Sequence, residues 1–177
     1  MEAQLALGAL LISMGAAAID VKTAKVPNWL TSGAIVTGLL ARALLAGWHG
    51  MAAGLLGALF GGGVLFLPFL ARGIGGGDVK LMAAVGAWVG MRHALALILA
   101  TAIAGGVLAV GYIIFRKRAG DIVWRVANVI RFHFVSGIEP NPALQAQPSE
   151  SMRFPYSLAI AAGALFVFVS IAAPVWR

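Results

Sequence analysis

Long apolar runs fill most of this 177-residue sequence, and they constrain its fold more than any other feature. Five of the six runs hold enough residues, at ~1.5 Å each, to cross a hydrocarbon core of about 30 Å. The fourth run is shorter. The runs cover residues 3–20, 29–47, 51–71, 79–91, 94–115 and 154–175. The sequence therefore predicts an all-α, polytopic integral membrane protein with six transmembrane helices.

The scarcity of charged residues excludes a soluble domain. Only 11% of the residues are charged and 61% are hydrophobic, whereas a soluble domain carries about 25% charged residues. The net charge of +7 does not indicate nucleic-acid binding, because the basic residues lie between the apolar runs, as topology determinants do. The chain has no cysteine, which excludes disulfides, thiolate metal sites and a cysteine nucleophile.

The positions of the basic residues predict the orientation in the membrane. The first run follows Glu2 rather than Lys or Arg, so we interpret it as a retained helix and not as a signal peptide. With six crossings and the N-terminus outside, ten basic residues fall on the inner side, and three, Arg42, Arg92 and Arg177, fall on the outer side. This asymmetry follows the positive-inside rule. If the short fourth run did not cross, the basic cluster at 116–118 would lie outside.

One long polar stretch, residues 116–153, interrupts the apolar pattern. Between Asp121 and Phe134 the apolar residues share one helical stripe and most polar residues share the other face. This pattern predicts an interfacial amphipathic helix in the last cytoplasmic loop. Its basic face favours binding to anionic lipid, and contact with a protein partner is the alternative. We interpret residues 1–177 as a single transmembrane domain that includes this loop.

Glycine pairs spaced four residues apart occur within the apolar runs. This spacing lets two helix backbones approach closely in a membrane. The pairs are Gly50/Gly54, Gly57/Gly61 and Gly86/Gly90. The sequence therefore predicts close helix–helix packing around these positions.

Acidic residues are few enough to sort by position. Of the six, one is near the N-terminus and three lie in the polar stretch, which leaves Asp20 and Asp78, each directly against an apolar run. Asp78 suits a helix N-terminal cap. Asp20 closes a helix, where the dipole repels a negative charge. A purely structural role therefore explains Asp20 poorly.

In the six-helix arrangement Asp20 and Asp78 fall on the same, cytoplasmic, side of the membrane. Two carboxylates close together in a partly desolvated site do not both ionise easily, so they share a proton. The ionised member can take a proton from water, and the protonated member can polarise a peptide carbonyl. We therefore expect a pair of catalytic aspartates that needs no metal and no cofactor.

Three short motifs resemble those of a known family. Residues 75–80 read GGGDVK and fit the G-x-G-D-x-K signature of type IV prepilin peptidases, which are GxGD-type membrane aspartic proteases. Residues 20–28 resemble the family's first motif, an Asp at the end of helix one followed by a Pro-Asn turn. Residues 154–156 resemble its C-terminal Pro-Tyr element. The motif residues that accompany the two aspartates are Lys22, Pro27, Asn28, Gly75, Gly77 and Lys80.

The resemblance implies an endopeptidase of the bacterial cytoplasmic membrane. Such an enzyme cleaves the short basic leader of prepilins or pseudopilins, typically after a glycine, at the cytoplasmic face, and Asp20 and Asp78 correspond to the catalytic pair. With no cysteine and no room before the first run, the chain resembles the short, single-function form associated with Tad/Flp-type pili. Methyltransferase activity is therefore not expected.

Two other functions are compatible with membrane-edge aspartates. An intramembrane GxGD protease acting on other membrane proteins also has a glycine-rich turn ahead of an aspartate, but the Pro-Asn and Asp-x-Lys elements fit the prepilin group better. A small ion- or proton-coupled transporter uses membrane carboxylates as well. Its path is expected to carry polar groups through the membrane, whereas both aspartates here fall on one side.

Overall fold

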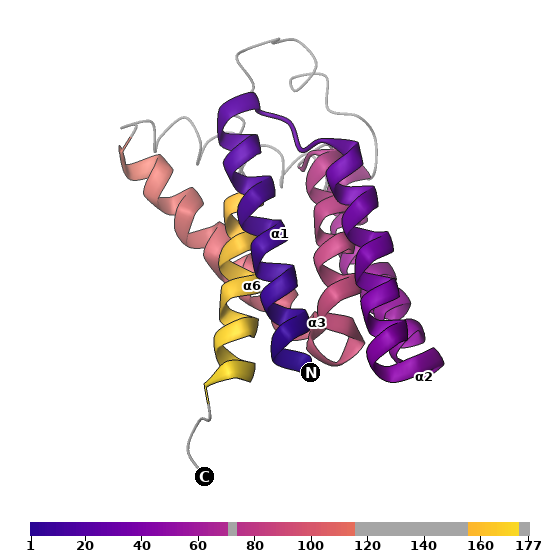
Figure 1. The fold of residues 1–177 in the computed structure, drawn as a ribbon. Helices are drawn as coiled ribbons and strands as arrows, with labels where there is room; N and C mark the ends of the chain where they lie inside the picture. The colour runs from indigo at the N-terminus through magenta and orange to yellow at the C-terminus, as the bar shows by residue number, and fades with distance from the viewer. Residues whose placement is uncertain (71–73, 116–155, 174–177) are drawn as a thin grey trace, which may run out of the picture. The chain divides into compact units, whose positions relative to one another are not determined.

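The computed structural model describes residues 1–70, 74–115 and 156–173, which are almost entirely helical (Figure 1). The helices are α1 (Glu2–Thr23), α2 (Asn28–Leu70), α3 (Gly76–Phe115) and α6 (Tyr156–Ala172). Three of these described helices, α1, α2 and α3, are long and apolar enough to cross a membrane, and α6 is a shorter apolar helix. The predicted all-α class is confirmed, and the composition of the helices agrees with a membrane protein. The amphipathic helix predicted within 116–153 lies outside the described residues.

The chain divides into two compact units. Residues 1–106 and 156–173 belong to the first unit, and the described part of the second unit is the end of α3, residues 107–115. All packing described below lies within the first unit. That the whole chain forms a single domain stays a prediction.

A break near its middle divides α2 into two arms, residues 28–45 and 48–70. Ala46 and Gly47 depart from helical geometry, and Gly47 has φ +60° and ψ −150°, a conformation that is essentially restricted to glycine. A Cβ atom at Gly54 would lie 3.1 Å from Cδ2 of Leu39, although an uninterrupted helix would hold these residues about 22 Å apart. The two arms therefore fold back on one another.

The helix α3 reverses in the same way at Gly90, which has φ +72° and ψ +170°. A Cβ atom at Gly105 would lie 3.0 Å from the ring of Tyr156, and Tyr156 interacts electrostatically with Asp78. In an uninterrupted helix Asp78 and Gly105 would be about 40 Å apart. Both breaks lie close to the boundaries between apolar runs predicted from the sequence, whereas the number of membrane crossings stays a prediction.

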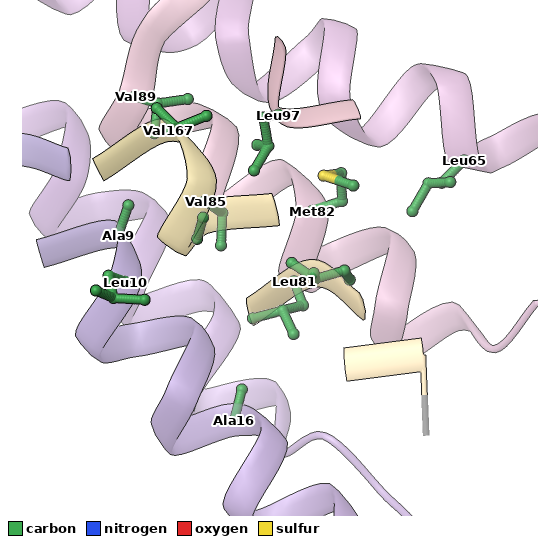
Figure 2. Close-up of a cluster of buried hydrophobic side chains, with 12 residues drawn as sticks. Ala9, Leu10, Ala16, Leu65, Leu81, Met82, Val85, Val89, Leu97 and Val167 are labelled. Carbon is green, nitrogen blue, oxygen red and sulfur yellow. The ribbon is translucent and has the colours of Figure 1, made fainter. Parts of the chain in front are cut away.

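The first arm of α3, residues 76–89, corresponds to the short fourth run and is the best buried segment among the described residues. At ~1.5 Å per residue it is about 21 Å long, less than the hydrocarbon core. Leu81, Met82 and Val85 are fully buried and lie at the centre of the hydrophobic cluster in Figure 2. Residues of α1, α2 and α6 complete this cluster. The short arm is therefore covered by protein rather than by lipid.

Glycines allow α2 and α3 to touch backbone to backbone. A Cβ atom at Gly57 would overlap the carbonyl oxygen of Gly86, and a Cβ atom at Gly86 would overlap that of Gly57. One turn further along, Gly61 faces the Met82 carbonyl in the same way, at 3.0 Å. The prediction that these glycines serve close helix packing is confirmed. The contact also fixes the position of α3 along the axis of α2, and with it the position of Asp78.

Arg42 links three helices at the end of α3's first arm that lies away from Asp78. Its side chain is buried, its Nε donates a hydrogen bond to the Trp88 carbonyl at 2.9 Å, and its Nη2 pairs with the Glu2 carboxylate at 3.2 Å. Trp88 lies in the last turn of its arm, where carbonyls lack helical partners. The sequence had indicated only that Arg42 lies on the outer side, and its pairing was missed.

Replacing Arg42 by methionine is expected to lower the free energy of unfolding by about 1–3 kcal/mol, the usual cost of leaving a buried polar group without its partner. Thermal unfolding in detergent, followed by tryptophan fluorescence, measures the change. Arg92→Met is the matched control, because Arg92 is exposed and makes no ion pair with the described residues. Equal stability of the two variants would contradict a structural role for Arg42.

Candidate active site

The turn between α1 and α2 determines where Asp20 lies. Ala24 adopts a left-handed conformation, with φ +54° and ψ +27°, and its N–H donates to the Asp20 carbonyl at 2.7 Å, which ends α1. Pro27 then precedes α2, and its carbonyl accepts a hydrogen bond from the Thr31 N–H. Asp20 is thereby placed in the last turn of α1 and is half-buried. Because Asp20 lies at the C-terminal end of α1, the dipole of this helix does not stabilise its negative charge.

Asp78 lies in the first turn of α3 and takes part in a helix cap. Gly75 is the capping residue, since its carbonyl accepts hydrogen bonds from the N–H groups of Asp78 and Val79 at 3.1 and 3.4 Å. The Asp78 carboxylate in turn accepts a hydrogen bond from the Gly75 backbone. This is one half of a capping box, in which the side chain at the third helical position bonds to the N–H of the capping residue, since glycine has no side chain to return the bond. The cap interpretation of Asp78 is therefore correct, but it accounts for only part of the surroundings of this half-buried side chain.

The two helix ends that carry the aspartates meet through a glycine. A Cβ atom at Gly77 would lie 3.3 Å from Cβ of Val26, so the α1–α2 turn packs directly on the start of α3. At this distance a larger residue would push the turn away. Asp20 is close enough to Asp78 for their charges to interact. The structure thus brings together the two residues that the sequence singled out.

The helix α6 contributes a third set of groups to the site. It lies beside α1 and runs antiparallel to it (Figure 1), which places its first turn at the Asp20 end of α1. The Ser157 hydroxyl donates a hydrogen bond of 2.6 Å to Oδ2 of Asp20. The neighbouring Tyr156 interacts electrostatically with Asp78. The first turn of α6 therefore bonds to one carboxylate and interacts electrostatically with the other.

The remaining motif residues lie around this pair without touching it. Lys80 Nζ donates a hydrogen bond of 2.9 Å to Oδ1 of Asn28, which joins the start of α3 to the start of α2 at an exposed position. Lys22 is exposed and has no hydrogen-bond or ion-pair partner among the described residues. The motif residues thus include a link between helices (Lys80 and Asn28), a helix-starting residue (Pro27) and an exposed cation (Lys22).

Ser157 is the site residue that sequence reasoning missed. The apolar pattern of α6 contains only two serines, Ser157 and Ser170, and Ser157 directly follows the Pro-Tyr motif. A hydroxyl in the first turn of an apolar helix, predicted to lie on the same side of the membrane as both aspartates, was the available signal.

The arrangement supports acid–base chemistry. Two interacting carboxylates can hold one proton between them, so that one acts as a base and the other as an acid. Among the residues that the structure describes, no three His, Asp or Glu side chains are grouped so that they could hold a metal ion. The groups that the described residues bring to this site are the carboxylate pair and its hydrogen-bonding neighbours.

Comparison with known proteins identifies the family of this chain. The family described as "Type IV leader peptidase family" matches residues 5–110, a segment that includes Asp20 and Asp78 but not α6. The chain is 32% identical over 106 residues to proteins named prepilin leader peptidase/N-methyltransferase from Aeromonas salmonicida (strain A449) and Aeromonas hydrophila. Each match covers 56% of this chain and 36% of the relative. No solved structure matches the chain significantly. This chain belongs to the type IV leader peptidase family.

Proposed function

We propose that this chain is an aspartic endopeptidase that removes the N-terminal leader of type IV prepilins or pseudopilins at the cytoplasmic face of the bacterial cytoplasmic membrane. Asp20 and Asp78 are its catalytic pair. The observation that carries the proposal is the electrostatic interaction between these two carboxylates, which come from different helices of a chain that belongs to the leader peptidase family.

In the proposed reaction, the ionised aspartate takes a proton from a water molecule as the water oxygen attacks the carbonyl carbon of the scissile peptide. The protonated aspartate gives its proton to the carbonyl oxygen, and a tetrahedral diol forms. When the C–N bond breaks, the amine of the mature pilin receives a proton from the pair. One water is consumed, and the leader acid and pilin amine are released.

The membrane placement that we propose has six crossings, one for α1, one for each arm of α2 and α3, and one for α6. Two exposed tryptophans support it. Trp29 and Trp48, 72% and 71% exposed, flank the first arm of α2, which is about 27 Å long. Tryptophan is enriched at both membrane interfaces. Trp29 follows the α1–α2 turn, so this placement puts the aspartate pair at one membrane interface.

The proposed substrate agrees with this position. A prepilin leader is short and basic, and a site at the cytoplasmic interface meets such a leader while the apolar part of the pilin stays in the bilayer. The polar stretch 116–153 is proposed to bind anionic lipid rather than the leader, because its own basic residues would repel a basic leader.

Co-expression with the pilin-like precursor encoded nearest to this gene tests the proposed function. Processing shortens the precursor and increases its mobility on a denaturing gel. The position of the cut is then read from the N-terminal sequence of the mature pilin. A precursor that keeps its length when the protein is present in the membrane would refute the proposal.

Removal of divalent cations is expected to leave the activity unchanged. The proposed mechanism uses only carboxylates and water, so purified enzyme treated with excess chelator should process precursor within about twofold of the untreated rate, a change too small to count as loss of a catalytic group. The control restores Mg²⁺ or Zn²⁺ to the treated sample. A loss of activity that returns with one of these ions would show that a metal takes part.

A further inference from the structure

The hydroxyl of Ser157 behaves differently from every other serine or threonine hydroxyl that forms a hydrogen bond among the described residues. Ser13, Thr23, Thr31, Thr37 and Ser170 donate only to backbone carbonyls three or four residues earlier or, for Thr23, also to one two residues later. Ser157 instead donates across to another helix, to Oδ2 of Asp20. Ser157 is fully buried, so its hydroxyl is shielded from water. Its position is therefore directed at Asp20.

The length of this bond lies within the range for a hydroxyl that donates to a carboxylate. Hydrogen bonds from a hydroxyl to a carboxylate are typically about 2.5–2.7 Å long, shorter than those between neutral groups. The Ser157–Asp20 bond is 2.6 Å. Ser157 also lies in the first turn of α6, where the helix dipole favours a nearby negative charge. The hydrogen bond and the dipole of α6 both favour a negative charge on Asp20, which the C-terminal end of α1 disfavours.

We propose that Ser157 is a positioning residue that orients Asp20 as the water-activating member of the pair and leaves Asp78 as the acid. By engaging Oδ2, the hydroxyl fixes the plane of the carboxylate and keeps Oδ1 free to accept the proton of the attacking water. This role rests on the proposed peptidase function. Ser157 itself lies outside the segment matched by the family, which ends at residue 110.

The test compares three substitutions at Ser157 by kinetics on the purified precursor used above. Ser157→Ala removes the donor, Ser157→Cys keeps nearly the same size with a weak donor, and Ser157→Thr keeps the hydroxyl. We expect Ser157→Ala and Ser157→Cys to lower kcat by about 10- to 100-fold, the effect of losing one hydrogen bond to a charged group. KM should stay within about twofold, because Ser157 does not touch the substrate. Ser157→Thr should keep more of kcat than Ser157→Cys.

Ser13→Ala is the matched control. Ser13 is equally buried, but its hydroxyl bonds only to the Leu10 carbonyl of its own helix, so kcat should stay near the wild-type value. Thermal unfolding of all variants separates a loss of fold from a loss of catalysis. The inference is overturned if the wild type processes precursor and Ser157→Cys matches it in kcat, or if the variants change KM alone. An inactive wild type would instead refute the proposed function.

Discussion

Replacing either Asp20 or Asp78 by asparagine is expected to abolish leader cleavage. Asparagine keeps the size of the side chain but can neither accept a proton from water as a carboxylate does nor deliver one as an acid does. Loss of an acid–base group costs about 100- to 10,000-fold in rate, so the mature pilin should disappear from a gel-based co-expression assay. Both variants should still insert in the membrane, because neither aspartate is a partner in the hydrophobic cluster.

Asp121→Asn provides the control for the loss of one acidic residue. Asp121 belongs to the polar stretch 116–153, for which we propose no part in the chemistry, and this variant should process precursor as the wild type does. A second variant, Asp78→Glu, keeps the charge but moves the carboxylate by one methylene. It should be strongly impaired if the spacing of the pair matters. Near wild-type processing by either asparagine variant would show that the paired-aspartate mechanism is wrong.

The close contact between α2 and α3 leads to a further expected effect on stability. Gly57→Ala and Gly86→Ala each place a methyl group onto the carbonyl oxygen of the other glycine. Because both partners are backbone, the helices must move apart, and such overpacking typically costs about 1–3 kcal/mol. We expect both variants to unfold at lower temperature than the wild type in detergent. Their activity should also fall, because α3 carries Asp78.

Gly63→Ala is the matched control, since Gly63 lies in the same helix as Gly57 and a Cβ atom there would meet nothing within 4 Å. Alanine favours helix over glycine by up to about 1 kcal/mol, so this variant should be at least as stable as the wild type. If Gly57→Ala were as stable as Gly63→Ala, the helices would be less closely packed than the structure shows.

Much of the fold could be predicted from the sequence because hydropathy reports directly on helices in a membrane protein. The apolar runs predicted the helical segments, and the breaks at Gly47 and Gly90 fall near the boundaries between runs. The meeting of Asp20 and Asp78 could also be predicted, since both fall on one side of a six-helix arrangement. The motifs then strengthened the choice of these two residues over the other acidic side chains.

Contacts between distant helices could not be predicted in this way. Hydropathy does not say which helices are neighbours, and α6 was expected only as a further apolar run, so its contact with Asp20 through Ser157 was missed. The sequence placed Arg42 among the outer charges but did not reveal its partners, because counting the charges on each side of the membrane gives no information on which residues pair. The burial of residues 76–89 likewise depends on neighbours from three other helices.

The contribution of α6 to the site determines how late in its synthesis the protein can become fully active. Asp20 and Asp78 leave the ribosome early, and the short arm that carries Asp78 has too little length to span the bilayer well without its neighbours. Ser157 emerges nearly eighty residues after Asp78. If Ser157 has the proposed role, the site is completed only when α6 docks against α1, so a nascent chain that still lacks this helix would hold both acids and yet cleave precursor slowly.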